Sequence, residues 1–105
     1  MIFEDELART LSEQLSIPYL SIMRIGFDSY AARLLPPEVG AAVAAIPVRI
    51  TGSTVHVAFA DPTDPQAISA VREHVPKIEI AVAELSDIRL AWREVARLRG
   101  LPAGG

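Results

Sequence analysis

The sequence predicts an α+β fold in which a three-stranded mixed sheet packs with helices and follows N-terminal helices. Alternating apolar residues in 46–50 and 54–60 flank the glycine-containing turn 51–53, which is typical of an antiparallel β-hairpin. A helical pattern over 65–75 then leads to a third alternating segment at 78–83. A crossover of this kind makes the third strand parallel to the second. The pattern leaves open which hairpin strand the third strand joins.

The N-terminal region predicts an amphipathic helix over residues 3–15. Leu7, Leu11 and Leu15 recur every four residues, so they share one face of that helix. We expect this leucine stripe to face an apolar surface. The helix is expected to end before Pro18, because a proline forces the preceding residue out of the helical region.

Three short elements are expected between the first helix and the hairpin. Residues 19–22 alternate and predict an extended segment, and residues 29–35 predict a helix that Pro36 ends. Pro37 then suits the first position of a further helix over 38–44, where its missing N–H costs nothing.

The C-terminal region predicts a capped helix followed by a linker. Ser86 is expected as the N-cap of a helix that runs to residue 98, with Gly100 as its stop signal. Residues 101–105, which are Leu, Pro, Ala and Gly, are typical of the start of a linker. We therefore expect one α+β domain over residues 1–100.

Composition restricts the function classes. The chain has 105 residues, which suits one domain, and it has no cysteine, which excludes disulfide bonds and thiolate metal sites and fits a cytoplasmic location. Residues 1–10 are acidic where a signal peptide is basic, and no stretch has the ~20 apolar residues that cross a bilayer. We expect no direct membrane insertion. The net charge of −3, with dispersed signs, does not favour nucleic-acid binding.

Few residues suit catalysis or metal binding. The two histidines, His56 and His74, lie apart in the sequence without an evident set of further ligands, so we expect no metal and no cofactor. The sequence also lacks a zinc-protease motif, a nucleophile-elbow motif and a Walker-type glycine loop. We therefore expect the isolated domain not to be an enzyme.

The most distinctive polar cluster is Asp61-Pro62-Thr63-Asp64. Two carboxylates at this spacing can form an acid/base pair or half of a cation site. They can also support the backbone, with Asp61 closing a turn and Asp64 capping the helix that starts at Pro65. We favour a structural role for Asp61, Pro62 and Asp64 over a small enzyme built on the two aspartates.

The last predicted helix carries a basic stripe. Arg89, Arg93 and Arg97 are spaced four residues apart and share one helix face. Such a stripe can meet an acidic partner or phosphates, but a solvated face in which Glu94 pairs with the arginines also explains it.

Five short motifs, in sequence order, resemble the N-terminal domain of type II secretion and type IV pilus-assembly ATPases, including MshEN-like domains. They cover nearly the whole chain and comprise the Leu11–Tyr19 run, Leu34-Leu35-Pro36, Ile46-Pro47-Val48, the Val55–Asp64 run with its Ala-Asp-Pro sequence, and Asp87-Ile88.

The resemblance implies a non-catalytic adaptor that docks a hexameric motor onto an inner-membrane platform protein. The domain is then cytoplasmic and peripheral to the membrane through its partner. Candidate interaction residues are Leu7 and Leu11 on the first helix and Arg89, Arg93 and Arg97 on the last. A related module precedes some membrane glycosyltransferases, so a regulatory domain of such an enzyme is the alternative.

Some members of the resembled family bind cyclic di-GMP through paired motifs that begin Arg-Leu-Gly and end Leu-x-x-x-Leu-x-x-Gln. This sequence keeps the second half of one copy, as Leu7, Leu11 and Gln14. We therefore do not expect cyclic di-GMP to be a ligand. In the alternative of a degenerate sensor, Arg9 and Gln14 are the binding residues to test.

Overall fold

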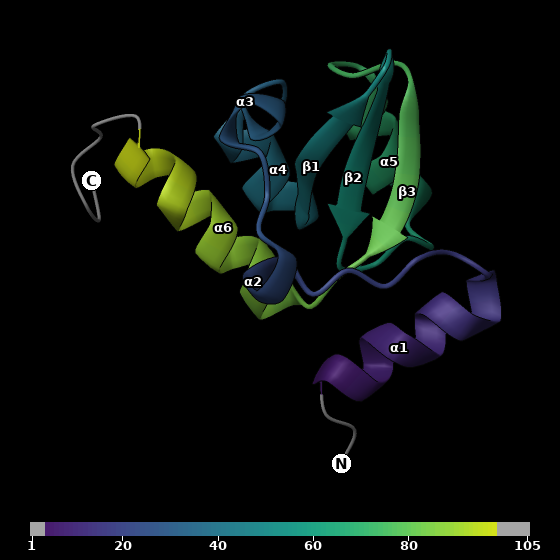
Figure 1. The fold of residues 1–105 in the computed structure, drawn as a ribbon. Coiled ribbons are helices and arrows are strands. Elements are labelled where there is room, and N and C mark those ends of the chain that lie inside the picture. The colour runs from purple at the N-terminus through teal and green to yellow at the C-terminus, as the bar shows by residue number, and fades with distance from the viewer. Residues whose placement is uncertain (1–3, 99–105) are drawn as a thin grey trace.

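The computed structural model describes residues 4–98 (Figure 1). The elements follow one another as α1 (Glu4–Leu15), α2 (Ile22–Ile25), α3 (Ser29–Ala32), α4 (Pro37–Val43), β1 (Ala45–Thr51), β2 (Thr54–Phe59), α5 (Pro65–Arg72), β3 (Ile78–Val82) and α6 (Leu85–Leu98). The predicted fold class is confirmed. The expected helix start at Phe3, the stop at Gly100 and the linker at 101–105 lie outside the described residues.

The sheet has the strand order β1-β2-β3, which answers the question that the sequence left open. β1 and β2 form the expected antiparallel hairpin, and β3 joins β2 in parallel, from Val55 opposite Ile78 to Phe59 opposite Val82. Part of the outer edge of β1 is already occupied, because the Asp28 N–H donates to the carbonyl of Val48 at 2.7 Å. The crossover adds its strand to the hairpin's second strand.

The segment before α2 adds a short pairing to the outer edge of β3. The Leu20 N–H donates to the Val82 carbonyl, and the Val82 N–H donates to the Pro18 carbonyl, both at 2.9 Å. The expected extended segment at 19–22 is thus correct at Tyr19, which bridges Val82 in parallel, but wrong at Ile22, where α2 begins. A helix of four residues is too short to show a helical period, so no sequence pattern predicts it.

The core lies between the sheet and the helices that cover its rear face, α4 and α5 in Figure 1, with α6 closing one side.

Helices α3 and α5 end earlier than the sequence pattern predicts, at Ala32 and Arg72, and each continues into a turn. Within residues 4–98, every helix is too short or too polar to cross a bilayer. The largest fully buried side chains include Phe59, Ile22, Leu35, Ile46 and Ile88.

Trp92 joins α6 to the start of β1. Its indole N–H donates to the carbonyl of Ala45 at 2.9 Å, in a buried position. Gly40 of α4 lies directly against the ring: a Cβ added there would be 2.6 Å from Cε2 of Trp92 and 2.8 Å from the Ala45 oxygen. A glycine is therefore required at residue 40 because the indole and the strand occupy the space of a side chain.

The leucine stripe of α1 does not face the core as the sequence led us to expect. Leu7 and Leu15 are 50% and 42% exposed, Leu11 is half-buried, and the buried residue of α1 is Ala8. The small side chain of Ala8 permits α1 to approach the edge of the sheet closely. The larger leucines lie on either side of this contact and are not covered by it. Two leucines are consequently left at the surface.

The N-terminus of α6 also differs from the prediction. The helix begins at Leu85, so Ser86 lies inside its first turn and is not the N-cap. The Ser86 N–H instead donates to Oε1 of Glu4, at 2.6 Å, and this bond attaches the start of α1 to the start of α6. A carboxylate at this position also suits the positive end of the helix dipole.

We predict that Gly40→Ala lowers the free energy of unfolding by about 1–3 kcal/mol, as overpacking of a filled core does. Alanine has a higher helix propensity than glycine, so any loss of stability can be attributed to the clash with Trp92. Urea unfolding followed by circular dichroism measures it. The exposed neighbour Ala41→Gly is the matched control, with a loss of at most about 1 kcal/mol. A Gly40→Ala variant as stable as the wild type would contradict the packing argument.

Candidate functional site

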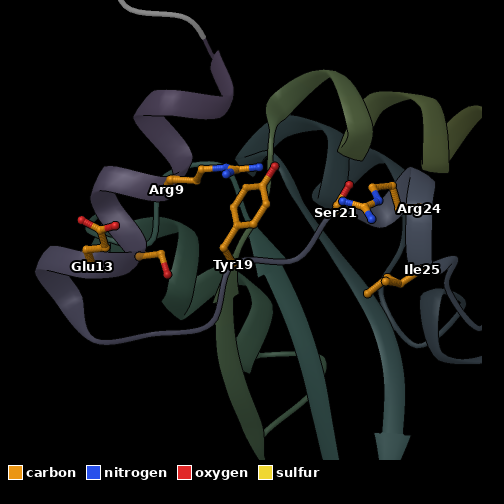
Figure 2. Close-up of a pocket in the computed structure, with 7 residues that line it drawn as sticks. Arg9, Glu13, Tyr19, Ser21, Arg24 and Ile25 are labelled. Carbon is orange, nitrogen blue, oxygen red and sulfur yellow. The ribbon is translucent and has the colours of Figure 1, made fainter.

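An open cavity of about 660 Å³ lies between α1 and the segment that runs from Tyr19 to Ile25 (Figure 2). Its lining combines two guanidinium groups, a phenol, a carboxylate, two hydroxyls and one aliphatic side chain, contributed by Arg9, Ser12, Glu13, Tyr19, Ser21, Arg24 and Ile25. The cavity thus presents charged and hydrogen-bonding groups around an accessible hollow.

The turn after α1 brings the two walls together. Ser16 adopts a left-handed conformation with φ 54°, and the Ser12 hydroxyl donates to the carbonyl of Ile17. The chain reverses there and runs along β3 as Pro18–Leu20. Because residues three and four apart share a helix face, Arg9, Ser12 and Glu13 then line one wall.

Tyr19 stands between Arg9 and the start of α6. The guanidinium carbon of Arg9 lies 5.4 Å from the centroid of the Tyr19 ring, within the range of a cation–π contact. The Tyr19 hydroxyl donates to Oε1 of Glu84 at 2.7 Å. Burial raises the pKa of Tyr19, and the hydrogen bond to Glu84 and the charge of Glu84 raise it further, against the opposing effect of Arg9. The phenol therefore remains a neutral donor at physiological pH.

The electrostatics of the cavity favour an anion. Among residues 4–98, neither Arg9 nor Arg24 forms a salt bridge, so both guanidinium groups are available to a ligand. A guanidinium fork pairs with phosphate or with the O6 and N7 atoms of guanine, and its flat face stacks on bases and aromatic rings. The arrangement therefore suits a planar, negatively charged ligand such as a nucleotide.

The structure brings one of the two sequence-predicted ligand residues to this cavity. Arg9 lines it, whereas Gln14 is exposed on α1 outside the lining. Sequence reasoning missed Arg24 and treated Tyr19 as part of a motif without a binding role. Arg24 lies in the four-residue α2, where no period or motif marks it, so the fold alone reveals its place at the site.

The predicted loop residues form their own local structure. Oδ1 of Asp61 accepts the Thr63 N–H at 3.0 Å, and Oδ1 of Asp64 accepts the Gln66 N–H at 2.9 Å as the N-cap of α5. Pro62 between them is buried. Both carboxylates thus bond the backbone of their own turn, and neither lines the cavity.

The other candidate residues lie on the surface. His56 contacts Glu79 through Nδ1 at 3.4 Å and Thr51 through Nε2 at 3.0 Å, on the sheet, and His74 is exposed. Within residues 4–98, no three His, Cys, Asp or Glu side chains gather as a metal site would need. The arginines of the predicted basic stripe, Arg89, Arg93 and Arg97, are all exposed on α6.

Residues 15–100 match the MshEN domain family. Among solved structures, the "Structure of MshE with cdg" matches with a TM-score of 0.83 at 26% identity, over 90% of this chain and 69% of that chain. The N-terminal domain of XpsE matches with a TM-score of 0.75 at 23% identity, over 87% of this chain and 65% of that chain, and shows a shared fold. No curated protein matches the chain.

The MshE structure corrects our expectation about cyclic di-GMP. We did not expect cyclic di-GMP as a ligand, yet a domain with this fold is solved with it, abbreviated cdg. The expectation was wrong because it relied only on motifs of neighbouring residues in the sequence. Folding brings Arg24 and Tyr19 to the same cavity as Arg9, and residues separated in sequence form no motif that can be read in advance.

We predict that Tyr19 titrates above its ordinary pKa near 10 and that Glu84→Gln lowers this pKa by removing the carboxylate charge. The chain has two tyrosines, so Tyr30→Phe leaves Tyr19 as the one observed by tyrosinate absorbance. The raised pKa means that the folded state favours the neutral phenol of Tyr19. This contribution to the free energy of unfolding is present below about pH 10 and is lost as the pH rises through the raised pKa. A Tyr19 pKa that Glu84→Gln leaves unchanged would refute the contact with Glu84.

Proposed function

The chain belongs to the MshEN domain family, and from this premise we propose that it is a non-catalytic regulatory domain that binds cyclic di-GMP in the cavity between α1 and residues 19–25. The observation that carries the proposal is that Arg9, which lies over the Tyr19 ring, and Arg24, which lies beyond Ser21, line one cavity (Figure 2). The structural similarity to MshE with cdg supports the same ligand.

The chemistry of the ligand fits the lining. Cyclic di-GMP has two guanine bases and two phosphates, each of which carries a negative charge. Arg9, with one face on the Tyr19 ring, can offer its other face to a guanine, so that the guanidinium is stacked between two π systems. Arg24 can pair with a phosphate, and the hydroxyls of Ser12 and Ser21 supply neutral hydrogen bonds.

We further propose that residues 1–100 form one domain of a type II secretion or type IV pilus-assembly ATPase, followed by a linker from residue 101. The similarity to MshE supports this parent, whereas the family membership by itself also fits the alternative, a membrane glycosyltransferase. The domain itself carries neither a nucleotide-hydrolysis motif nor a catalytic dyad among residues 4–98. In this proposal it works in the cytoplasm and regulates a motor encoded further along the same chain.

The second candidate function is docking onto an inner-membrane platform protein, which would hold the motor at the membrane. Exposed apolar and basic groups favour it: Leu7 is 50% exposed, and Arg89, Arg93 and Arg97 form an exposed row on α6. Binding of a ligand against Arg9 would change the surroundings of the same helix that carries Leu7. Both functions can therefore belong to one domain.

We predict that cyclic di-GMP binds the wild-type domain in a calorimetric titration. Arg9→Ala and Arg24→Ala should each weaken binding about tenfold or more, since each removes a charge-assisted bond to the ligand. Affinity should also fall as salt rises.

The matched control is Arg72→Ala, an exposed arginine of α5 outside the cavity, which should bind as the wild type does. The mononucleotide GMP serves as a specificity control and should bind more weakly, because it offers one base and one phosphate. Absence of a binding signal from the wild type, or equal losses in all three variants, would argue against the site.

For the docking function, we predict that the immobilised domain retains the cytoplasmic region of the cognate platform protein and that Leu7→Asp abolishes retention. Loss of an apolar contact at the centre of an interface explains the effect. The exposed Ala42→Asp on α4 adds the same charge elsewhere and should leave retention intact. Failure of the wild-type domain to retain the protein would reject this second function.

A further inference from the structure

A second cavity, of about 360 Å³, adjoins the proposed ligand site. It combines an apolar floor with one carboxylate and one guanidinium, and the lining includes Leu20, Ile25, Phe27, Val48, Asp28 and Arg49. Ile25 also lines the cavity that holds Arg9 and Arg24, at the side away from α1 (Figure 2). The first cavity therefore continues towards β1, which contributes Val48 and Arg49.

The turn after α2 builds the wall of this second cavity. Gly26, with φ 78°, ends α2 in a conformation that other residues rarely adopt, and the chain then runs beside β1. The Asp28 N–H donates to the Val48 carbonyl at 2.7 Å, which fixes this segment against the strand. Asp28 and Arg49, which are distant in the sequence, thereby line one hollow.

Both charged groups of the second cavity are available to a ligand. Within the described part of the chain, neither Asp28 nor Arg49 forms a salt bridge, although they line the same hollow. Oδ1 of Asp28 accepts the Tyr30 N–H at 2.9 Å as the N-cap of α3. A carboxylate has about four acceptor sites, so Asp28 can accept further hydrogen bonds from a ligand.

This combination of groups suits a guanine base. The Watson–Crick edge of guanine presents two adjacent donors, N1–H and N2–H, which one carboxylate can accept together. The flat guanidinium of Arg49 can stack on the base, and the apolar floor can cover its remaining surface. Adenine presents an acceptor, N1, at the same edge, where it would face the carboxylate of Asp28. The lining therefore favours guanine over adenine.

We infer that the second cavity binds one guanine of cyclic di-GMP through Asp28 and Arg49 and provides the base specificity of the site. The inference rests on the proposed function, in which the other base stacks on Arg9 and a phosphate pairs with Arg24. Arg24 directly precedes Ile25, the residue shared by the two cavities, which suits a phosphate that joins two bases. Stacking on Arg9 tolerates any base, because every base has a π face, so one guanine is sufficient.

The test is calorimetric titration of the purified chain with cyclic di-GMP, the mixed dinucleotide cyclic GMP–AMP and cyclic di-AMP. The wild type should bind the first two with similar affinity and cyclic di-AMP about tenfold or more weakly, because the paired contact to guanine is lost. Asp28→Asn should reduce the preference for cyclic di-GMP over cyclic di-AMP about tenfold. Asparagine caps helices as well as aspartate does, so α3 is retained.

Two further variants complete the test. Arg49→Lys keeps the charge but loses the flat guanidinium, and it should weaken binding of cyclic di-GMP about two- to fivefold. Asp61→Asn is the matched control, because Asp61 also accepts the N–H two residues ahead, at 3.0 Å, and lies outside both cavities. It should leave the preference for guanine unchanged.

The outcomes separate this inference from the proposed function. If cyclic di-GMP binds and Asp28→Asn leaves the preference unaltered, the inference is overturned and the proposed function stands. Binding of the mixed dinucleotide as weak as that of cyclic di-AMP would overturn it in the same way. A wild type that binds none of the three dinucleotides would reject the proposed function and the inference with it.

Discussion

The hydrogen bond from the Trp92 indole to the carbonyl of Ala45 is the constraint on which the arrangement depends. It holds the last helix against the first residue of the sheet, although the two are far apart in the sequence. The ring reaches that carbonyl because Gly40 leaves room for it and because Ala44, with φ 53°, ends α4 in a left-handed turn. Without this bond, the buried indole N–H would have no hydrogen-bond partner. The position that packs the ring in the core therefore also satisfies its polar group.

Once α6 is fixed, its first turn and the residue before it, Glu84, organise the N-terminal third of the chain. Glu84 accepts the hydroxyl of Tyr19, the Ser86 N–H bonds Glu4, and Oδ2 of Asp87 accepts the Met23 N–H at 3.3 Å. These contacts position α1, the Tyr19 segment and α2 from one end of one helix. The walls of the cavity are therefore set by α6, which contributes no residue to its lining.

Helix α1 links the two surfaces to which we assign functions. One side places Arg9 in the cavity, and another exposes Leu7 and Leu15. Since α1 buries little beyond Ala8, a ligand that stacks on Arg9 can shift the helix at small cost. Ligand binding and docking through Leu7 would then share one free-energy coupling, and each would alter the other by the same factor.

The sequence by itself determined the mixed fold, the hairpin, the parallel crossover and the cap at Asp64, because alternation, helical period and turn residues act over a few neighbouring positions. It did not determine the pairing of Pro18–Leu20 with β3, the exposure of the leucine stripe, or the placement of Arg24 and Arg9 in the lining of one cavity. Those features arise from contacts between segments distant in the chain. Local patterns cannot encode them, because which face of α1 is buried and which residues share a cavity depend on where the sheet edge and α6 lie.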